Sequence, residues 1–207
     1  MRIIGNDPNV PRQTHEVASG TMTNGTAVVV NSDGTVSVVA ETAEALGSAT
    51  VFEAAEVDRI GIAFDSSNNK VVIAYKDYGN SGAGTAIVGT VSGTSISFGT
   101  AVVFYDAESL QGTGDAGIDA TFDSSNNKVV LAWPVSGGGK AIVGTVSGTS
   151  ISFGSVAEFD SGASVSEIYT TFDSSNNKVV IAYRDGNNSD YGTAIVGTVS
   201  GTSISFG

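Results

Sequence analysis

The 207-residue chain contains no cysteine, only three prolines and one histidine, and nine lysines and arginines in total. Without cysteine it can form neither a disulfide framework nor a thiolate metal site. No stretch reaches the ~20 apolar residues of a membrane helix, and the N-terminus lacks the apolar run of a signal peptide. The net charge of −12 disfavours binding to nucleic acid or to an anionic membrane surface.

Signals of enzymatic chemistry are also scarce. There is no Gly-x-Ser-x-Gly sequence, no histidine-rich metal motif and no phosphate-binding loop. Two of the four arginines, Arg2 and Arg12, lie near the N-terminus, and His15 has no plausible triad partner. We therefore expect a protein that is not an enzyme and that needs no cofactor or metal. A glycan-processing enzyme with paired carboxylates is a second alternative, although nothing marks such a pair.

What the chain does contain is repetition. The phrases FDSSNNKVV and AIVGTVSGTSISFG each occur three times without change, at 64–72, 122–130 and 172–180 and at 86–99, 141–154 and 194–207. Four equivalent glycines lie 52, 55 and 53 residues apart, namely Gly47, Gly99, Gly154 and Gly207. A period of this length indicates a solenoid, a propeller or an array.

Each repeat has the pattern of four β-strands. In the first repeat they are expected at 59–65, at 70–75, at 85–91, and from 94 on into 100–104. The second and third are nearly continuously apolar, whereas SISF alternates, as a half-exposed outer strand would. The prediction is an all-β protein of tandem four-stranded antiparallel repeats of about 53 residues, interpreted as β-propeller blades, with a solenoid or sandwich array as the alternative.

Two shorter parts precede the array of residues 46–207. Residues 1–20 contain two prolines and no periodicity, and we expect an extended arm; 21–45 should form a β-hairpin around NSDG. Three blades are fewer than the four to eight of a closed propeller. Either the chain continues beyond Gly207 or copies associate; the sequence favours the first, because earlier SISFG copies run on into a further apolar segment.

The invariant phrase DSSNN has two interpretations. Aspartate and asparagine favour tight turns, because their side chains bond nearby backbone amides and asparagine tolerates the left-handed conformation. Their oxygens also suit calcium, but the EF-hand spacing and its distal glutamate are absent. We therefore predict a hairpin turn, and attribute the identity of the copies to recent duplication. On this view, function depends on the residues that differ between copies.

Those differing residues fall between the second and third strands and between consecutive repeats. In a meander these connections emerge at the same end, so variation should be confined to one end of a rigid scaffold. Tyrosine with aspartate and asparagine can stack on and hydrogen-bond a sugar; ordinary polar turns are the alternative. The candidate ligand-binding residues are Asp77, Tyr78, Asn80, Tyr105, Asp106, Asp185, Asn188, Asp190 and Tyr191. Tyr75, Trp133 and Tyr183, which end the second strand, are expected in the core.

The phrases FDSSNNKVVIAYRDGNNSDYGTAIVGTVSGTSISFG and IIGNDPNVPRQTHEVASGTMTNGTAVVVNSDGTVSVVA resemble repeat-bearing virion proteins of marine tailed phages, the cyanophages and pelagiphages. The FD-turn-NNKVVIAY hairpin is more loosely similar to β-propeller repeats. This resemblance implies a virion structural protein, a tail-fibre or appendage component. We expect other virion proteins, further copies of the chain and a host-surface glycan as its partners.

A capsid decoration, collar or adaptor protein with only protein contacts is the alternative. The N-terminal arm, through Arg2, Asn6 and Arg12, would anchor the chain in the particle, because an extended peptide can join a partner's sheet edge or groove.

Overall fold

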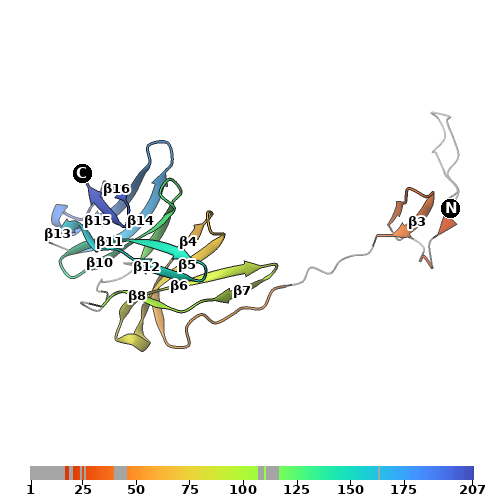
Figure 1. Ribbon diagram of the computed structural model, residues 1–207, viewed down its shortest axis with the longest axis horizontal. Coiled ribbons are helices and arrows are strands. Elements are labelled where there is room, and N and C mark those ends of the chain that lie inside the picture. Colours follow the sequence, from red (N-terminus) through yellow and green to blue (C-terminus); the bar gives the residue numbers. More distant parts are fainter. Residues whose placement is uncertain are drawn as a thin grey trace. The chain divides into compact units, whose positions relative to one another are not determined.

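The computed structural model describes residues 17–18, 21–23, 25, 27–39, 46–106, 110, 117–162 and 164–207 (Figure 1). The chain forms two compact units, Met1–Leu46 and Gly47–Gly207. The expected arm at 1–20, with Arg2, Asn6 and Arg12, lies outside the described residues except for Val17 and Ala18.

The N-terminal unit contains a small three-stranded sheet. The antiparallel hairpin expected around NSDG is present, and the strands are β1 (Val17–Ala18), β2 (Val28–Val30) and β3 (Thr35–Val38), in the order β1-β3-β2. Asp33 stabilises the turn, because its Oδ1 accepts hydrogen bonds from the amide and hydroxyl of Thr35 at 3.0 and 2.7 Å. Gly34 supplies the positive φ of +81° that the turn requires.

The larger unit consists of three antiparallel sheets, each built from one sequence repeat (Figure 1). Sheet I contains β4 (Val57–Asp65), β5 (Lys70–Asp77), β6 (Ala83–Ser92), β7 (Ser95–Phe98) and β8 (Val102–Tyr105). Sheet II contains β9 (Asp119–Asp123), β10 (Lys128–Val135), β11 (Gly138–Ser147), β12 (Ser150–Phe153) and β13 (Ala157–Ser161). Sheet III contains β14 (Val165–Asp173), β15 (Lys178–Asp185), β16 (Tyr191–Ser200) and β17 (Ser203–Phe206).

The fourth strand differs from the expected continuous strand. In sheet I, β7 and β8 are separate and both pair with the same strand, β6, with β7 opposite Gly89–Ser92 and β8 opposite 84–86. Gly99 lies between the two strands and approaches the next sheet closely, since a Cβ there would overlap the carbonyl oxygen of Thr149. β12 and β13 are divided in the same way.

The sheets stack face to face through two apolar cores. We call the side of a sheet that meets the next repeat its forward face, and the opposite side its rear face. The forward face of sheet I includes Ala63, Val72, Ala74, Ala86 and Val88, and it packs on Val129, Leu131, Trp133 and Ile142 of sheet II. The forward face of sheet II, with Val130, Ala132, Ala141 and Val143, packs on Val179, Ile181 and Tyr183 of sheet III.

One aromatic cluster recurs at each rear face. A phenylalanine lies against the aromatic residue of the second strand (Tyr75, Trp133 or Tyr183) and against the phenylalanine of SISF. The ring centroids of Phe104 lie 5.0 Å from Trp133 and 5.6 Å from Phe153, and those of Phe159 lie 5.2 Å from Tyr183 and 5.9 Å from Phe206. Phe52 makes the same contacts with Tyr75 and Phe98. The expected core positions of Tyr75, Trp133 and Tyr183 are confirmed, since all three are buried.

The invariant phrase forms the predicted hairpin turn. Asp65 Oδ1 accepts hydrogen bonds from the amides of Ser67 and Asn68, both at 3.0 Å, and Asn69 adopts a φ of +52°. The turns are also joined to one another: Ser67 Oγ donates to Asn127 Oδ1 at 2.6 Å, and Ser125 Oγ donates to Asn177 Oδ1 at 2.5 Å. These contacts form a serine–asparagine ladder across the stack. Duplication alone therefore does not account for the identity of the copies.

Candidate functional site: the loop end of the stacked sheets

The variable connections of each sheet lie at the end opposite the DSSNN turns. In sheet I, Val57 pairs with Asp77, Asp77 with Ala83, and Tyr105 with Gly84, so the connections after β5 and β8 emerge at one end. Sheets II and III have the same strand polarity. Because the ladder aligns the turns at one end of the stack, the variable loops share the other end. We call it the loop end.

The connections after the second strand differ in size. Those of sheets I and III contain the 3-10 helices η1 (Tyr78–Asn80) and η2 (Gly186–Asn188), each followed by a serine in the left-handed conformation. In sheet II, β10 continues to Val135 and β11 begins at Gly138, so the variable connection after the second strand is only a two-residue hairpin turn. The longer displayed loops are those of sheets I and III.

The candidate residues of sheet I divide into structural and exposed groups. Asp77 is buried at the start of η1, and Tyr105 is buried with its ring 5.3 Å from that of Trp133. Asn80 and Asp106 are exposed. Tyr78 is 46% exposed, and the Lys76 ammonium lies 4.8 Å from its ring centroid. Lys76 Nζ also donates to the Leu110 carbonyl at 2.9 Å, which fixes the cation beneath the tyrosine.

The candidate residues of sheet III divide in the same way. Asp185 is buried and caps η2, since its Oδ1 accepts the Asn187 amide at 2.8 Å. Asn188, Asp190 and Tyr191 are exposed, Tyr191 to 63%. Asp190 forms an ion pair with Arg184 at 2.8 Å. Of the nine sequence candidates, Tyr78, Asn80, Asp106, Asn188, Asp190 and Tyr191 present their side chains to solvent.

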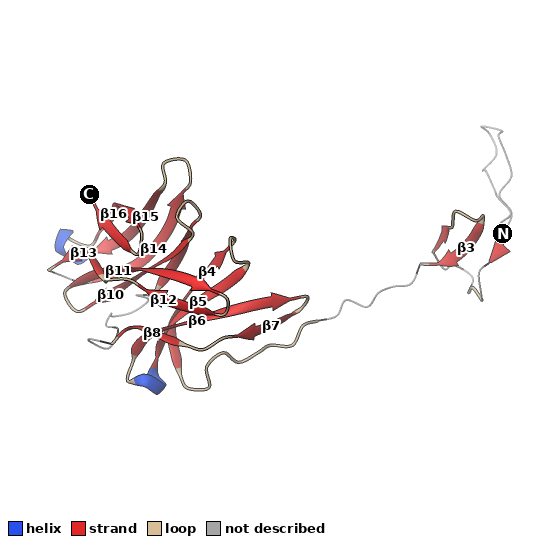
Figure 2. Ribbon diagram, viewed as in Figure 1, coloured by secondary structure: helices blue, strands red, loops and turns tan. Residues whose placement is uncertain are grey.

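The structure does not gather these residues into one pocket. Asp77, Tyr78, Asn80, Tyr105 and Asp106 lie on sheet I, and the others lie on sheet III. Figure 2 shows η1 and η2 as two separate short helices. The loop end therefore presents two groups of polar and aromatic side chains, separated by sheet II.

A network between sheets II and III was not anticipated from the sequence. Asp160 Oδ2 accepts from Tyr183 Oη at 3.1 Å, and Asp160 Oδ1 accepts from Asn187 Nδ2 at 3.3 Å. Burial, together with its hydrogen bond to Asp160, raises the pKa of Tyr183 to about 12. Burial also raises the pKa of Asp160, while the Tyr183 hydrogen bond opposes this shift. The sequence signal for the place of Asp160 was its position directly after Phe159, which is equivalent to the position of Tyr105 after Phe104 in the preceding repeat.

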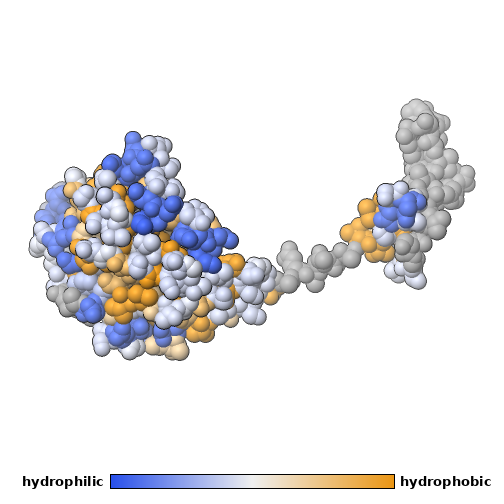
Figure 3. Space-filling view, in the orientation of Figure 1, coloured by the Kyte–Doolittle hydropathy of each residue, from blue (hydrophilic) through white to orange (hydrophobic). Residues whose placement is uncertain are grey.

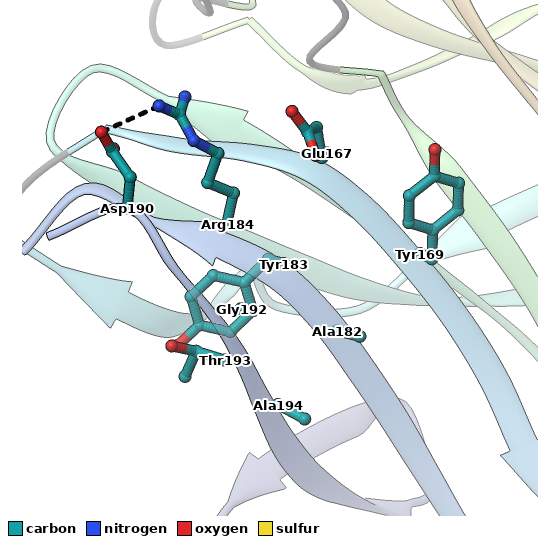
Figure 4. Close-up of a pocket in the computed structure, with 9 residues that line it drawn as sticks. All are labelled: Glu167, Tyr169, Ala182, Tyr183, Arg184, Asp190, Gly192, Thr193 and Ala194. Atoms are coloured by element: carbon teal, nitrogen blue, oxygen red, sulfur yellow. Dashed lines mark ion pairs between the residues drawn. The ribbon is translucent and has the colours of Figure 1, made fainter. Parts of the chain in front are cut away.

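The forward face of sheet III contains an open hollow of about 460 Å³ (Figure 4). Glu167 and Tyr169 border it from β14, Ala182 and Arg184 from β15, and Gly192 and Ala194 from β16. The lining includes the methyl groups of Ala182 and Ala194, and the Arg184–Asp190 ion pair lies at one side. No motif in the sequence singled out this face.

Within the described residues, no group of three or more acidic or histidine side chains is placed to hold a metal ion. No helix in this part of the chain is long and apolar enough to cross a membrane. The chain matches no family model, no curated protein and no solved structure.

Proposed function

We propose that the chain is a non-enzymatic structural component of a phage virion, of the tail-fibre or appendage class. It displays the loop end of its stacked sheets to a host-surface glycan. The three sheets act as propeller blades, and the N-terminal arm, through Arg2, Asn6 and Arg12, attaches the chain to other virion proteins. The virion assignment is supported by the sequence resemblance, and the binding role by the geometry of the loop end.

The observation that carries the binding role is the separation of constant and variable residues. Identical DSSNN turns join the sheets at one end through the serine–asparagine ladder. The variable connections, after the second strand of each sheet and between consecutive repeats, lie at the opposite end, on loops held by strands that are part of two buried cores. A rigid scaffold with adaptable loops is the arrangement of a recognition protein.

The exposed side chains at the loop end suit a carbohydrate ligand. Tyr78 and Tyr191 present large partly apolar rings to solvent, and Asn80 and Asn188 carry amides that both donate and accept hydrogen bonds. Sugar rings offer apolar C–H faces and hydroxyl groups, so they can use both kinds of contact. The negative net charge favours a neutral or cationic glycan over a sulfated one.

A glycan array tests this function with a loop-end variant that combines Tyr78→Ala, Asn80→Ala, Asn188→Ala and Tyr191→Ala. We expect the parent chain to bind a defined glycan set and the variant to lose this binding. A matched control replaces the first serine of each DSSNN turn by alanine, at Ser66, Ser124 and Ser174, which are exposed at the opposite end. This control should bind as the parent chain does.

The two outcomes separate the classes of virion protein. Loss of binding in the loop-end variant alone supports host recognition. If the correctly folded parent chain binds no glycan, the display role is wrong. The alternative, a capsid decoration, collar or adaptor protein that contacts only other proteins, then replaces it.

A further inference from the structure

We propose that the hollow on the forward face of sheet III is a docking site for a second copy of this chain, which inserts residues 47–53 and the rear face of its sheet I. Two copies then join head to tail at both ends and close a ring of six sheets, three from each chain. This inference concerns self-association and does not rest on glycan binding.

The forward face of sheet III is exposed at the positions that are buried in the other sheets. Val72, Ala74, Ala86 and Val88 of sheet I are all fully buried under sheet II, and the equivalent residues of sheet II are fully buried under sheet III. In sheet III the equivalents Ala182 and Ala194 are exposed and Val196 is 45% exposed. Tyr169, at the edge of the same face, is 70% exposed.

The rear face of sheet I is exposed at the complementary positions. Val91 is 54% exposed, whereas its equivalents Val146 and Val199 are 7% and 6% exposed under the preceding sheet. Ile62 and Phe64 are 61% and 55% exposed. Apolar residues thus reach the surface of this unit at two faces that correspond to the two sides of the internal interfaces. Figure 3 shows apolar residues (orange) at the surface of the larger unit in one view.

The equivalent glycines of the third strand, Gly84, Gly139 and Gly192, indicate which kind of side chain fits the hollow. A Cβ on Gly84 would lie 2.7 Å from the ring of Phe104, and a Cβ on Gly139 would overlap the ring of Phe159. The equivalent Gly192 borders the hollow and has nothing within 4 Å of that position among the described residues. In each internal interface, this glycine therefore accommodates a phenylalanine.

Phe52 is the phenylalanine that fits. It already lies on Tyr75 and Phe98 of its own sheet I, with centroids 5.1 and 5.9 Å apart, as Phe104 and Phe159 lie on the sheets that follow them. Gly47 likewise approaches Thr94 as Gly99 approaches Thr149. Residues 47–53 are therefore equivalent to the segments that contain β8 and β13. In sheet III no described residue occupies the matching place: residues 192–194 of β16 pair with β15 on one edge and have no partner strand on the other.

In the docked state, residues 50–53 of the second copy pair with this edge of β16. Val102 and Val103 pair with Ala86 and Thr85 in sheet I, so by equivalence Thr50 and Val51 meet Ala194 and Thr193. Val51 is 77% exposed in the single chain, which is consistent with a side chain that is covered only after docking. Phe52, half-buried in the single chain, then covers Gly192.

Two further contacts match across the proposed junction. Ser67 and Ser125 each donate to an asparagine in the next turn, and the hydroxyl of Ser175 and the amide of Asn69 make no such contact within the described chain. Docking places them opposite each other. Between β9 and β14, the Thr170 hydroxyl donates a hydrogen bond to Asp119 at 2.9 Å. At the proposed junction the equivalent positions are Tyr169 of one copy and Ile62 of the other, whose side chains are largely apolar and exposed.

Sedimentation equilibrium of the full chain tests the association. We expect twice the chain mass of 20.8 kDa. Ala194→Arg on sheet III should weaken association by about 100-fold or more, because the charge would be buried without a partner. Ser205→Arg, at an exposed position on β17 of the same sheet, is the matched control and should associate normally. Circular dichroism checks that each variant is folded.

Mixing two variants, each blocked on a different sheet, distinguishes head-to-tail docking from association through two identical faces. Ile62→Glu blocks sheet I, so it should also be monomeric alone, whereas a mixture with Ala194→Arg can form one intact junction and should give a one-to-one dimer. A monomeric parent chain at all soluble concentrations overturns the proposal. So does an Ile62→Glu variant that still dimerises by itself, since sheet III would then bind another sheet III.

A disulfide trap gives a second, independent readout, because the chain has no cysteine of its own. The double variant Ser175→Cys/Asn69→Cys should form covalent dimers on mild oxidation. The variant Ser125→Cys/Asn177→Cys, whose parent side chains already touch within one chain at 2.5 Å, should form only intramolecular bridges. Covalent dimers at equal levels in both variants would indicate random collision and contradict the proposed junction.

Discussion

At the scale of single residues, the aspartate that begins each DSSNN turn makes the same hydrogen bonds in all three copies but differs in burial. Asp65, Asp123 and Asp173 all accept two backbone amides and one asparagine side chain in their turns. Asp65 and Asp123 are buried, whereas Asp173 is more accessible, at the third repeat. The same bonds therefore act on carboxylates with different access to water.

The first prediction at this scale is a lowered pKa for Asp173. Its hydrogen bonds to Asn176 and to the amides of Ser175 and Asn176 lower this pKa below the ordinary 3.8. A lowered pKa in the folded state contributes stability above the unfolded pKa, and this contribution is lost as the pH falls through the folded value. NMR titration of the Asp173 carboxyl carbon should give a midpoint below 3.8, and Asp173→Asn should lose less stability on acidification. A midpoint at or above 3.8 would contradict the hydrogen-bond account.

A second residue-scale prediction concerns Gly99. Its substitution by alanine places a methyl group against the carbonyl oxygen of Thr149 in the next sheet. We expect overpacking to lower the free energy of unfolding by about 1–3 kcal/mol. Gly117→Ala is the matched control, because a Cβ there has nothing within 4 Å and the glycine has no positive φ. Chemical denaturation checks both, and equal stabilities would show that the sheets can separate without cost.

At the scale of elements, the DSSNN turn closes a hairpin and also links neighbouring sheets. The ladder bonds join residues 60 and 52 positions apart in the sequence, between turns whose internal bonds are all local. One phrase, identical in the three repeats, thus closes its own strand pair and aligns the stacked sheets. This alignment places all variable loops at the opposite end.

The element-scale prediction tests the ladder. Ser125→Ala removes the hydroxyl that bonds Asn177 and should destabilise the contact between sheets II and III by about 0.5–1.5 kcal/mol. Ser124→Ala, one residue earlier and equally exposed, should be within about 0.5 kcal/mol of the parent chain. The measurement is hydrogen exchange of sheet III amides together with denaturant unfolding. If the two variants behave alike, the ladder does not hold the stack together.

At the scale of the whole molecule, the chain divides into two compact units, and the three described core clusters all lie in the larger one. The sheet of β1–β3 belongs to the unit Met1–Leu46, and the three larger sheets belong to Gly47–Gly207. A stack in which each sheet contacts only its neighbours gains stability from every additional interface. The proposed ring would add two such interfaces for each pair of chains.

The whole-molecule prediction separates anchoring from folding. Deleting residues 2–18 removes the predicted arm, with Arg2, Asn6 and Arg12, together with β1 of the small sheet, and leaves the larger unit intact. We expect the larger unit to keep its β-sheet circular dichroism signal and its unfolding midpoint, with loss of incorporation into particles. Deletion of residues 201–207, which contain β17, is the contrasting control, because it should lower the unfolding midpoint. Normal incorporation of the first variant would move the anchor to another segment.

The sequence by itself determined the local features of this protein. The 52–55-residue period, the strands of each repeat, the NSDG hairpin and the DSSNN turns all follow from interactions between residues close in the chain. The confinement of variable loops to one end followed from strand alternation and is confirmed by the registers. The interpretation as propeller blades stays a proposal.

Only the tertiary structure decided how the sheets meet and which loop residues remain free. Asp77, Tyr105 and Asp185 have the same polar or aromatic character as their exposed neighbours, yet they are buried because the next sheet or the loop itself covers them. The ladder, the glycines beneath phenylalanine rings and the hollow of sheet III join residues about 50 positions apart. Such contacts depend on stacking, because repeats that share one sequence differ in burial only through their place in the stack.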